Sequence, residues 1–136
     1  MLDFNWIAII VAAVAAQFIG FLWYGPFFGK VWAELVGYKK KDIEKMRKSN
    51  MTGRYLLYFL CFLISAFVLQ NLVGIFGSYT FVDGIGIGFL VWLGFIATIS
   101  LSAVLFENKP AKLYLLNNLF YLISFIVMGI ILTVWR

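Results

Sequence analysis

The stretch FNWIAIIVAAVAAQFIGFLWY, residues 4–24, decides the fold, because it carries no charged side chain over its whole length. A helix crosses the hydrocarbon layer of a bilayer with about 20 apolar residues. Hydrocarbon offers the backbone no other hydrogen-bond partner, so the stretch predicts a transmembrane helix. We expect it to be retained, because a cleaved signal peptide begins with basic residues and this stretch follows Asp3.

Three further stretches have the same character, at residues 56–76, 82–106 and 113–135, and their single charge is Asp83 at the start of one of them. None shows the strict alternation of a barrel strand. The composition agrees, because 64% of the residues are hydrophobic and 12% are charged, whereas soluble domains have about a quarter charged. The sequence therefore predicts an all-α integral membrane protein, a four-helix transmembrane bundle in a single domain over residues 1–136.

The connections between the spans also carry signals. Pro26 is expected to break the first helix, and the polar residues 39–50 predict a short surface helix with Ile43 and Met46 on one side. Residues 80–83 have the pattern of a capping box, and residues 108–110, Asn-Lys-Pro, predict a tight turn.

Lysine and arginine are concentrated on one side of this topology. The first loop holds Lys30, Lys39, Lys40, Lys41, Lys45, Arg47, Lys48 and Arg54. The third loop holds Lys109 and Lys112, and the opposite side holds Arg136 alone. The positive-inside rule therefore predicts that the first and third loops and the surface helix are cytoplasmic, with both termini on the other side.

Small residues predict which helices pack closely, because they let two backbones approach each other in lipid. One face of the first helix carries Ala8, Ala12, Ala16 and Gly20, and the third carries Gly84, Gly88, Gly94, Thr98 and Ser102. We therefore expect the first and third helices to form the core. The second and fourth, rich in Leu, Ile and Phe, are expected to face lipid.

Several chemistries are excluded by residue type. The chain has no histidine and one cysteine, Cys61, so it has no histidine-ligated haem or zinc and no intrachain disulfide. We expect no metal, no cofactor and no enzymatic activity, because paired carboxylates and a reactive cysteine setting are also missing. Cys61 lies in an apolar run and is expected to be a buried, inert thiol. The net charge of +5 indicates attraction to anionic lipid rather than to nucleic acid.

Neutral polar residues cluster at similar depth in the cytoplasmic half of the bilayer. They are Gln17, Thr98, Ser102, Asn117 and Asn118. One interpretation is hydrogen bonding between helices, worth about 0.6 to 2 kcal/mol per bond. The other is a polar pocket or pore lining that opens toward the cytoplasm.

Aromatic and basic residues follow one another where the first helix meets the first loop. They are Trp23, Tyr24, Lys30, Trp32, Lys39, Lys40 and Lys41. Aromatic side chains favour the headgroup layer and lysines favour anionic lipid. This segment is therefore predicted to anchor the protein and to contact lipid headgroups on the cytoplasmic side.

The pattern Gly20-x-x-Trp23-Tyr24-x-Pro26-x-x-Gly29-x-x-Trp32, followed by Leu35-x-Gly37, resembles the N-terminal signature of a bacterial four-span membrane protein family of unknown function. Later elements of the same pattern are Asp83-Gly84, Trp92-Leu93-Gly94-Phe95, Phe106-Glu107-x-Lys109-Pro110 and Met128-Gly129. The resemblance implies a bacterial source, and with it an inner-membrane location with periplasmic termini. It implies no activity.

Two functional hypotheses follow. The first is a non-enzymatic membrane protein that is homo-oligomeric or lipid-associated, since four short helices enclose little interior of their own. The alternative is a small channel or facilitator for a small solute, lined by the polar residues of the cytoplasmic half.

Overall fold

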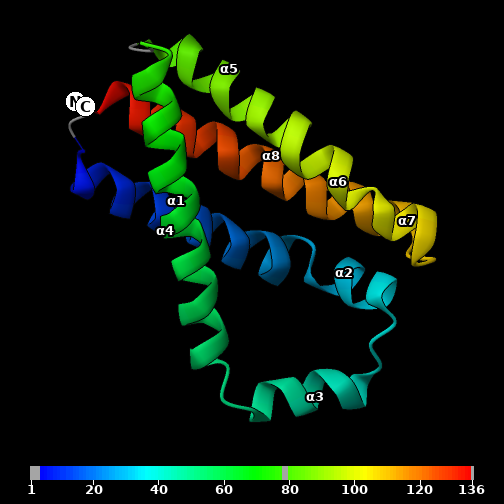
Figure 1. Cartoon of the computed structure of the whole chain (residues 1–136). Coiled ribbons are helices and arrows are strands. Elements are labelled where there is room, and N and C mark those ends of the chain that lie inside the picture. Colours follow the sequence, from blue (N-terminus) through cyan, green and yellow to red (C-terminus); the bar gives the residue numbers. More distant parts are fainter. Residues whose placement is uncertain (1–3, 78–79, 136) are drawn as a thin grey trace.

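The computed structural model describes residues 4–77 and 80–135, and all regular structure in these ranges is helical. Four helices are long and apolar enough to cross a membrane, namely Trp6–Phe27, Thr52–Ile75, Phe81–Phe106 and Ala111–Val134. The predicted all-α fold with four membrane helices is confirmed. The start of α1 and the end of α8 lie at the same end of the bundle, and α2 lies near its other end (Figure 1).

The first span consists of α1 (Trp6–Leu22) and a π-helical turn, η1 (Trp23–Phe27). Pro26 therefore does not end the helix at Tyr24 as expected, because the wider π turn accommodates it. The amide of Phe28 closes this turn by donating to the Trp23 carbonyl at 2.8 Å. Gly29 follows at a close approach, since a Cβ there would lie 2.7 Å from the Tyr24 carbonyl oxygen.

Two short helices connect the first span to the second. They are α2 (Gly29–Val36), which ends at Gly37 with a left-handed φ of 91°, and α3 (Lys40–Lys48). The predicted polar surface helix is thus present as α3. The second span, α4 (Thr52–Ile75), begins four residues before the predicted one.

The third span is interrupted. It consists of α5 (Phe81–Val91), a second π-helical segment η2 (Trp92–Ala97), α6 (Thr98–Ser100) and α7 (Ser102–Phe106). The predicted capping box opens it, because Thr80 Oγ1 accepts from the Asp83 amide at 3.1 Å and Asp83 Oδ2 accepts from the Thr80 amide at 3.2 Å. A turn with Asn108 at a φ of 55° leads into α8 (Ala111–Val134).

The central element is α8, which packs against α1, α4 and α5. It buries Phe120, Met128 and Leu132 completely, and it carries the most buried residues of the described helices. The expectation that the fourth helix faces lipid is therefore wrong. Lipid is as apolar as Leu or Phe, so a run of large apolar residues does not distinguish a lipid face from a bundle core.

The expectation that the third helix belongs to the core holds only at its N-terminal end, where Gly84 and Gly88 are buried. The rest of that span is largely exposed, including Gly94, Thr98 and Ser102. Small residues allow two helix backbones to approach closely but do not require it. In this span, the face of α5 that carries Gly84 and Gly88 makes such a close approach, to α8. The first helix is buried as expected, through Ala8, Ala12, Ala13 and Ala16 among others.

The second span, α4, crosses the bundle at a steep angle, so that its first half departs from the other helices (Figure 1). Its first ten residues include no buried one, and all of its buried residues lie between Phe62 and Val73. There the backbone amide of Asn5 donates to Gln70 Oε1 at 3.2 Å and ties α1 to α4. The splayed first half leaves space beside η1 and α2, and the candidate site occupies this space.

Candidate functional site

A groove of about 460 Å³ lies among η1, α2, α3 and the splayed start of α4. Its lining combines Lys30 and Trp32 of α2 with Ile43, Met46 and Arg47 of α3. The amphipathic spacing of α3 explains this arrangement, because positions three and four residues apart share one helix face. Three residues that the sequence predicts to contact lipid headgroups, Tyr24, Lys30 and Trp32, thus line one groove.

The charged side chains of the groove are both basic. Lys30 and Arg47 are exposed, and neither has an acidic partner in the described ranges 4–77 and 80–135. A cation without a counter-ion, next to an apolar wall, is available to an external anion. The groove can therefore hold a molecule that joins an anionic group to an apolar part.

Aromatic rings form one wall of this groove. Trp32 meets Tyr24 and Tyr38 edge to face, with ring centroids 5.9 and 5.4 Å apart. Edge-to-face pairs hold rings in fixed orientations. Trp23 is turned elsewhere, since its indole Nε1 donates to the Leu116 carbonyl at 3.1 Å. The exposed residues Lys39, Lys40 and Lys41 do not line the groove.

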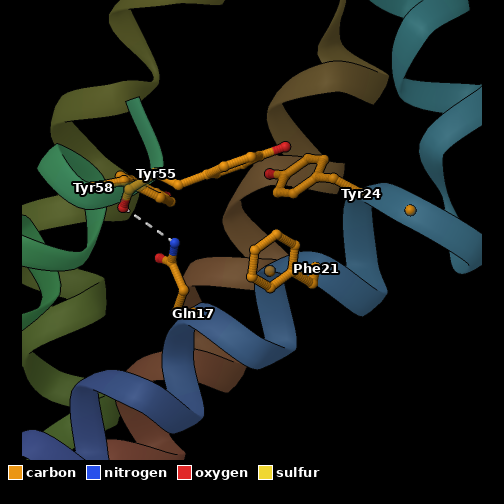
Figure 2. A pocket seen from close by; sticks show the side chains of 7 residues that line it. Gln17, Phe21, Tyr24, Tyr55 and Tyr58 are labelled. Atoms are coloured by element: carbon orange, nitrogen blue, oxygen red, sulfur yellow. Dashed lines mark hydrogen bonds between the residues drawn. The ribbon is translucent and has the colours of Figure 1, made fainter. Parts of the chain in front are cut away.

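A smaller recess of about 210 Å³ continues the groove between α1 and α4. Figure 2 shows Gln17, Phe21 and Tyr24 of the first span facing Tyr55 and Tyr58 of α4 across it. Gln17 Nε2 donates to the Tyr55 carbonyl at 3.3 Å, and the Phe21 and Tyr55 rings lie 5.2 Å apart. The recess and the groove share Tyr24, Gly25 and Tyr55, so the two spaces adjoin.

Asn117 and Asn118 hold helices together. Asn117 Oδ1 accepts from the Tyr24 hydroxyl at 2.6 Å, which joins the first span to α8. The Ser100 hydroxyl shares its one proton between the Ile96 carbonyl of its own span, at 2.6 Å, and Asn118 Oδ1, at 3.1 Å, which joins the third span to α8. Both asparagines thus make the interhelical hydrogen bonds that one sequence interpretation expected of this polar layer.

The other predicted polar residues lie apart from these. Thr98 donates to the Gly94 carbonyl of its own helix at 2.9 Å, and both Thr98 and Ser102 are exposed on the third span. Gln17 lines the recess between α1 and α4, whereas Asn117 and Asn118 line a different cavity beside the third span. The pore lining proposed for these residues is not assembled within one subunit and stays a prediction.

Cys61 is exposed, so the expectation of a buried thiol is wrong. It lines a cleft between α4 and the third span, together with Tyr58 and Tyr121. Its apolar neighbours in the sequence are residues of a membrane helix, and such residues face lipid as readily as they face the core.

Arg47, Tyr55 and Tyr58 are site residues that sequence reasoning did not single out. Arg47 could have been found, because it lies four residues after Ile43 on the predicted surface helix of the loop. Tyr55 and Tyr58 lie at the start of the second span, where tyrosine favours the same membrane interface as Tyr24. Their place across the recess from Gln17 depends on the tilt of α4, which the sequence does not predict.

The family described as Protein of unknown function (DUF1761) matches residues 7–133. The chain belongs to this family. The DUF1761 match covers all four membrane helices together with the groove and the recess. No curated protein and no solved structure matches the chain.

Proposed function

We propose that this DUF1761 protein is a non-enzymatic, lipid-associated protein of the bacterial inner membrane that holds the headgroup of an anionic phospholipid in the groove beside α2 and α3. The observation that carries the proposal is the pair Lys30 and Arg47, two cations without acidic partners among the described residues, at a groove walled by Trp32 and Tyr38.

The charge of the cytoplasmic leaflet supports this assignment. Anionic headgroups attract each lysine or arginine near the surface by about 1 kcal/mol. The positive-inside rule assigns the loop that carries α2 and α3 to that side. Tryptophan and tyrosine favour the same layer of the bilayer. The positive charge of the groove, its aromatic wall and its expected place at the membrane surface thus all favour a phospholipid headgroup as the ligand.

Self-association through the third span is part of the same proposal. Gly86 and Gly94 are exposed, and a Cβ at either position would meet no atom within 4 Å. Exposed small residues allow a helix of a second copy to approach the backbone closely. A homo-oligomer formed this way would leave the groove on α2 and α3 accessible in each subunit.

The test compares two double variants that each remove two positive charges. Lys30→Gln with Arg47→Gln changes the groove, whereas Lys45→Gln with Lys48→Gln changes α3 outside it. Binding is measured as quenching of tryptophan fluorescence by brominated phosphatidylglycerol in phosphatidylcholine nanodiscs. We expect the groove variant to lose about tenfold or more in affinity, because a hydrogen bond to a charged group is worth about 1.5–3 kcal/mol. The control should lose much less, because its lysines contribute only general attraction to the membrane surface. Equal losses in both variants would refute a specific groove and leave only general attraction of the loop to the surface.

A further inference from the structure

The recess beside the groove extends deeper into the membrane. Gln17 precedes Tyr24 by seven residues on the first span, which places it about 10 Å further along the helix. The walls at this depth are the rings of Phe21 and Tyr58 and the glycine Gly20. An amphiphile with its anionic end in the groove would therefore bring its next few atoms into the recess.

The passage between groove and recess is open at Gly25. This residue borders both spaces, and a Cβ built on it would meet no atom within 4 Å. Tyr24 and Tyr55 are the other two residues that both spaces share. A side chain at position 25 would narrow this passage, and its Cβ would press on no atom of the protein.

Unused hydrogen-bond donors line the recess. An amide side chain has two N–H bonds, and Gln17 uses one of them toward the Tyr55 carbonyl. Gln17 Oε1 is buried and has no hydrogen-bond partner, so the amide nitrogen is the group of this side chain that a molecule in the recess could reach. The Tyr55 hydroxyl donates to no described residue, whereas the Tyr24 hydroxyl is occupied by Asn117. The recess therefore offers donors to a ligand that brings acceptors.

We infer that this recess binds the acyl ester region of the phospholipid whose headgroup lies between Lys30 and Arg47, with Gln17 and Tyr55 donating hydrogen bonds to its ester carbonyl oxygens. The inference rests on the proposed function and narrows its ligand to an ester-linked anionic glycerophospholipid. Ester carbonyls accept hydrogen bonds and donate none, and they lie just below the headgroup, which matches the position and chemistry of the recess.

The first experiment changes the lipid and leaves the protein unaltered. Diacyl phosphatidylglycerol is compared with its dialkyl ether analogue, which has the same headgroup and chains of the same length but no carbonyl acceptors. Two lost hydrogen bonds predict an affinity at least about fivefold weaker for the ether lipid. Equal affinities for the two lipids would overturn the inference.

The second experiment narrows the passage. Gly25→Leu is compared with Gly53→Leu, which adds the same side chain at another exposed glycine that has open space around its Cβ and lines neither the groove nor the recess. We expect Gly25→Leu to weaken binding of the ester lipid strongly and to remove the preference for ester over ether, while Gly53→Leu keeps both. Unchanged ester preference in Gly25→Leu would contradict the assignment of the recess.

A third measurement distinguishes a lipid from a free anion. Glycerol phosphate, a soluble headgroup fragment, is expected not to displace the ester lipid, and full displacement would overturn the inference in favour of a phosphate site. The Lys30→Gln and Arg47→Gln pair separates the two proposals. If that pair weakens binding but ester and ether lipids bind alike, only the inference about the recess fails. If the pair has no effect, the proposed function fails with it.

Discussion

Gly84 of α5 and Gly129 of α8 touch backbone to backbone. A Cβ on Gly84 would lie 2.6 Å from the Gly129 carbonyl oxygen, closer than side chains pack in proteins. Gly88 continues this contact one turn further along α5, against the backbone of Phe125 and Ile126. The N-terminal part of the third span is thus held to the central helix by close backbone contact at Gly84 and Gly88.

Gly84→Ala is predicted to destabilise the bundle. The added methyl group forces α5 away from α8, and overpacking of this kind costs about 1–3 kcal/mol in the free energy of unfolding. Unfolding in a denaturing detergent series measures the loss. Gly86→Ala is the control, because its Cβ points into open space and alanine favours a helix over glycine by about 1 kcal/mol. Equal stability of the two variants would contradict the observed contact.

Tyr24→Phe is predicted to loosen the first span from α8, because it removes the 2.6 Å hydrogen bond to Asn117. The expected loss is about 0.6 kcal/mol, the average measured for such bonds in a membrane protein, and at most about 1.7 kcal/mol. A double-mutant cycle with Asn117→Leu isolates the pair, and the second substitution should cost little once the first is present. Fully additive losses would show that the two side chains do not interact.

Cys61 is predicted to face lipid, because it is exposed on a membrane-spanning helix. A spin label on Cys61 should collide often with oxygen, which dissolves in hydrocarbon, and rarely with a water-soluble nickel complex. The matched control is Ala66→Cys in a Cys61→Ser background, since Ala66 is completely buried on the same helix. Similar oxygen accessibility at both positions would mean that Cys61 is covered, as a second copy at this cleft would cause.

Both termini are predicted to be periplasmic. Alkaline phosphatase becomes active only where its disulfides form, so a fusion after Arg136 should be active in an oxidising periplasm. A fusion within the loop at Asn50, between α3 and α4, should be inactive. The reverse pattern would invert the topology and would move the groove to the outer leaflet.

The number of spans, the capping box and the surface helix follow from sequence, because each depends on local signals. An apolar stretch of sufficient length without charges predicts a membrane span. Thr80 and Asp83 predict the start of a helix whatever the arrangement of the other helices. The turn at Asn108 and Pro110 is likewise predicted from its own residues. These features need no knowledge of the neighbouring helices.

The arrangement of the spans in the bundle was not predictable in the same way. Phe120 is completely buried and Phe95 is 74% exposed, although both lie in equally apolar helices. In a water-soluble protein the hydrophobic effect would disfavour an exposed phenylalanine. In lipid an outward-facing ring carries no such free-energy cost, so apolarity does not tell which ring is buried. The candidate site shows the same contrast. Lys30 and Trp32 were predicted from the run of aromatic and basic residues after the first span, whereas the position of Tyr55 at the recess depends on the tilt of α4.

The central position of α8 has a consequence for biosynthesis. The first three spans are made before the helix that all of them contact. Until α8 has been inserted, Gly84, Gly88 and the Tyr24 hydroxyl lack the partners that the structure gives them. The contact of α5 with α8 and the hydrogen bond of Tyr24 to Asn117 therefore form only after the last span has been translated, whereas α1 and α4, which contact each other directly, have partners before that point.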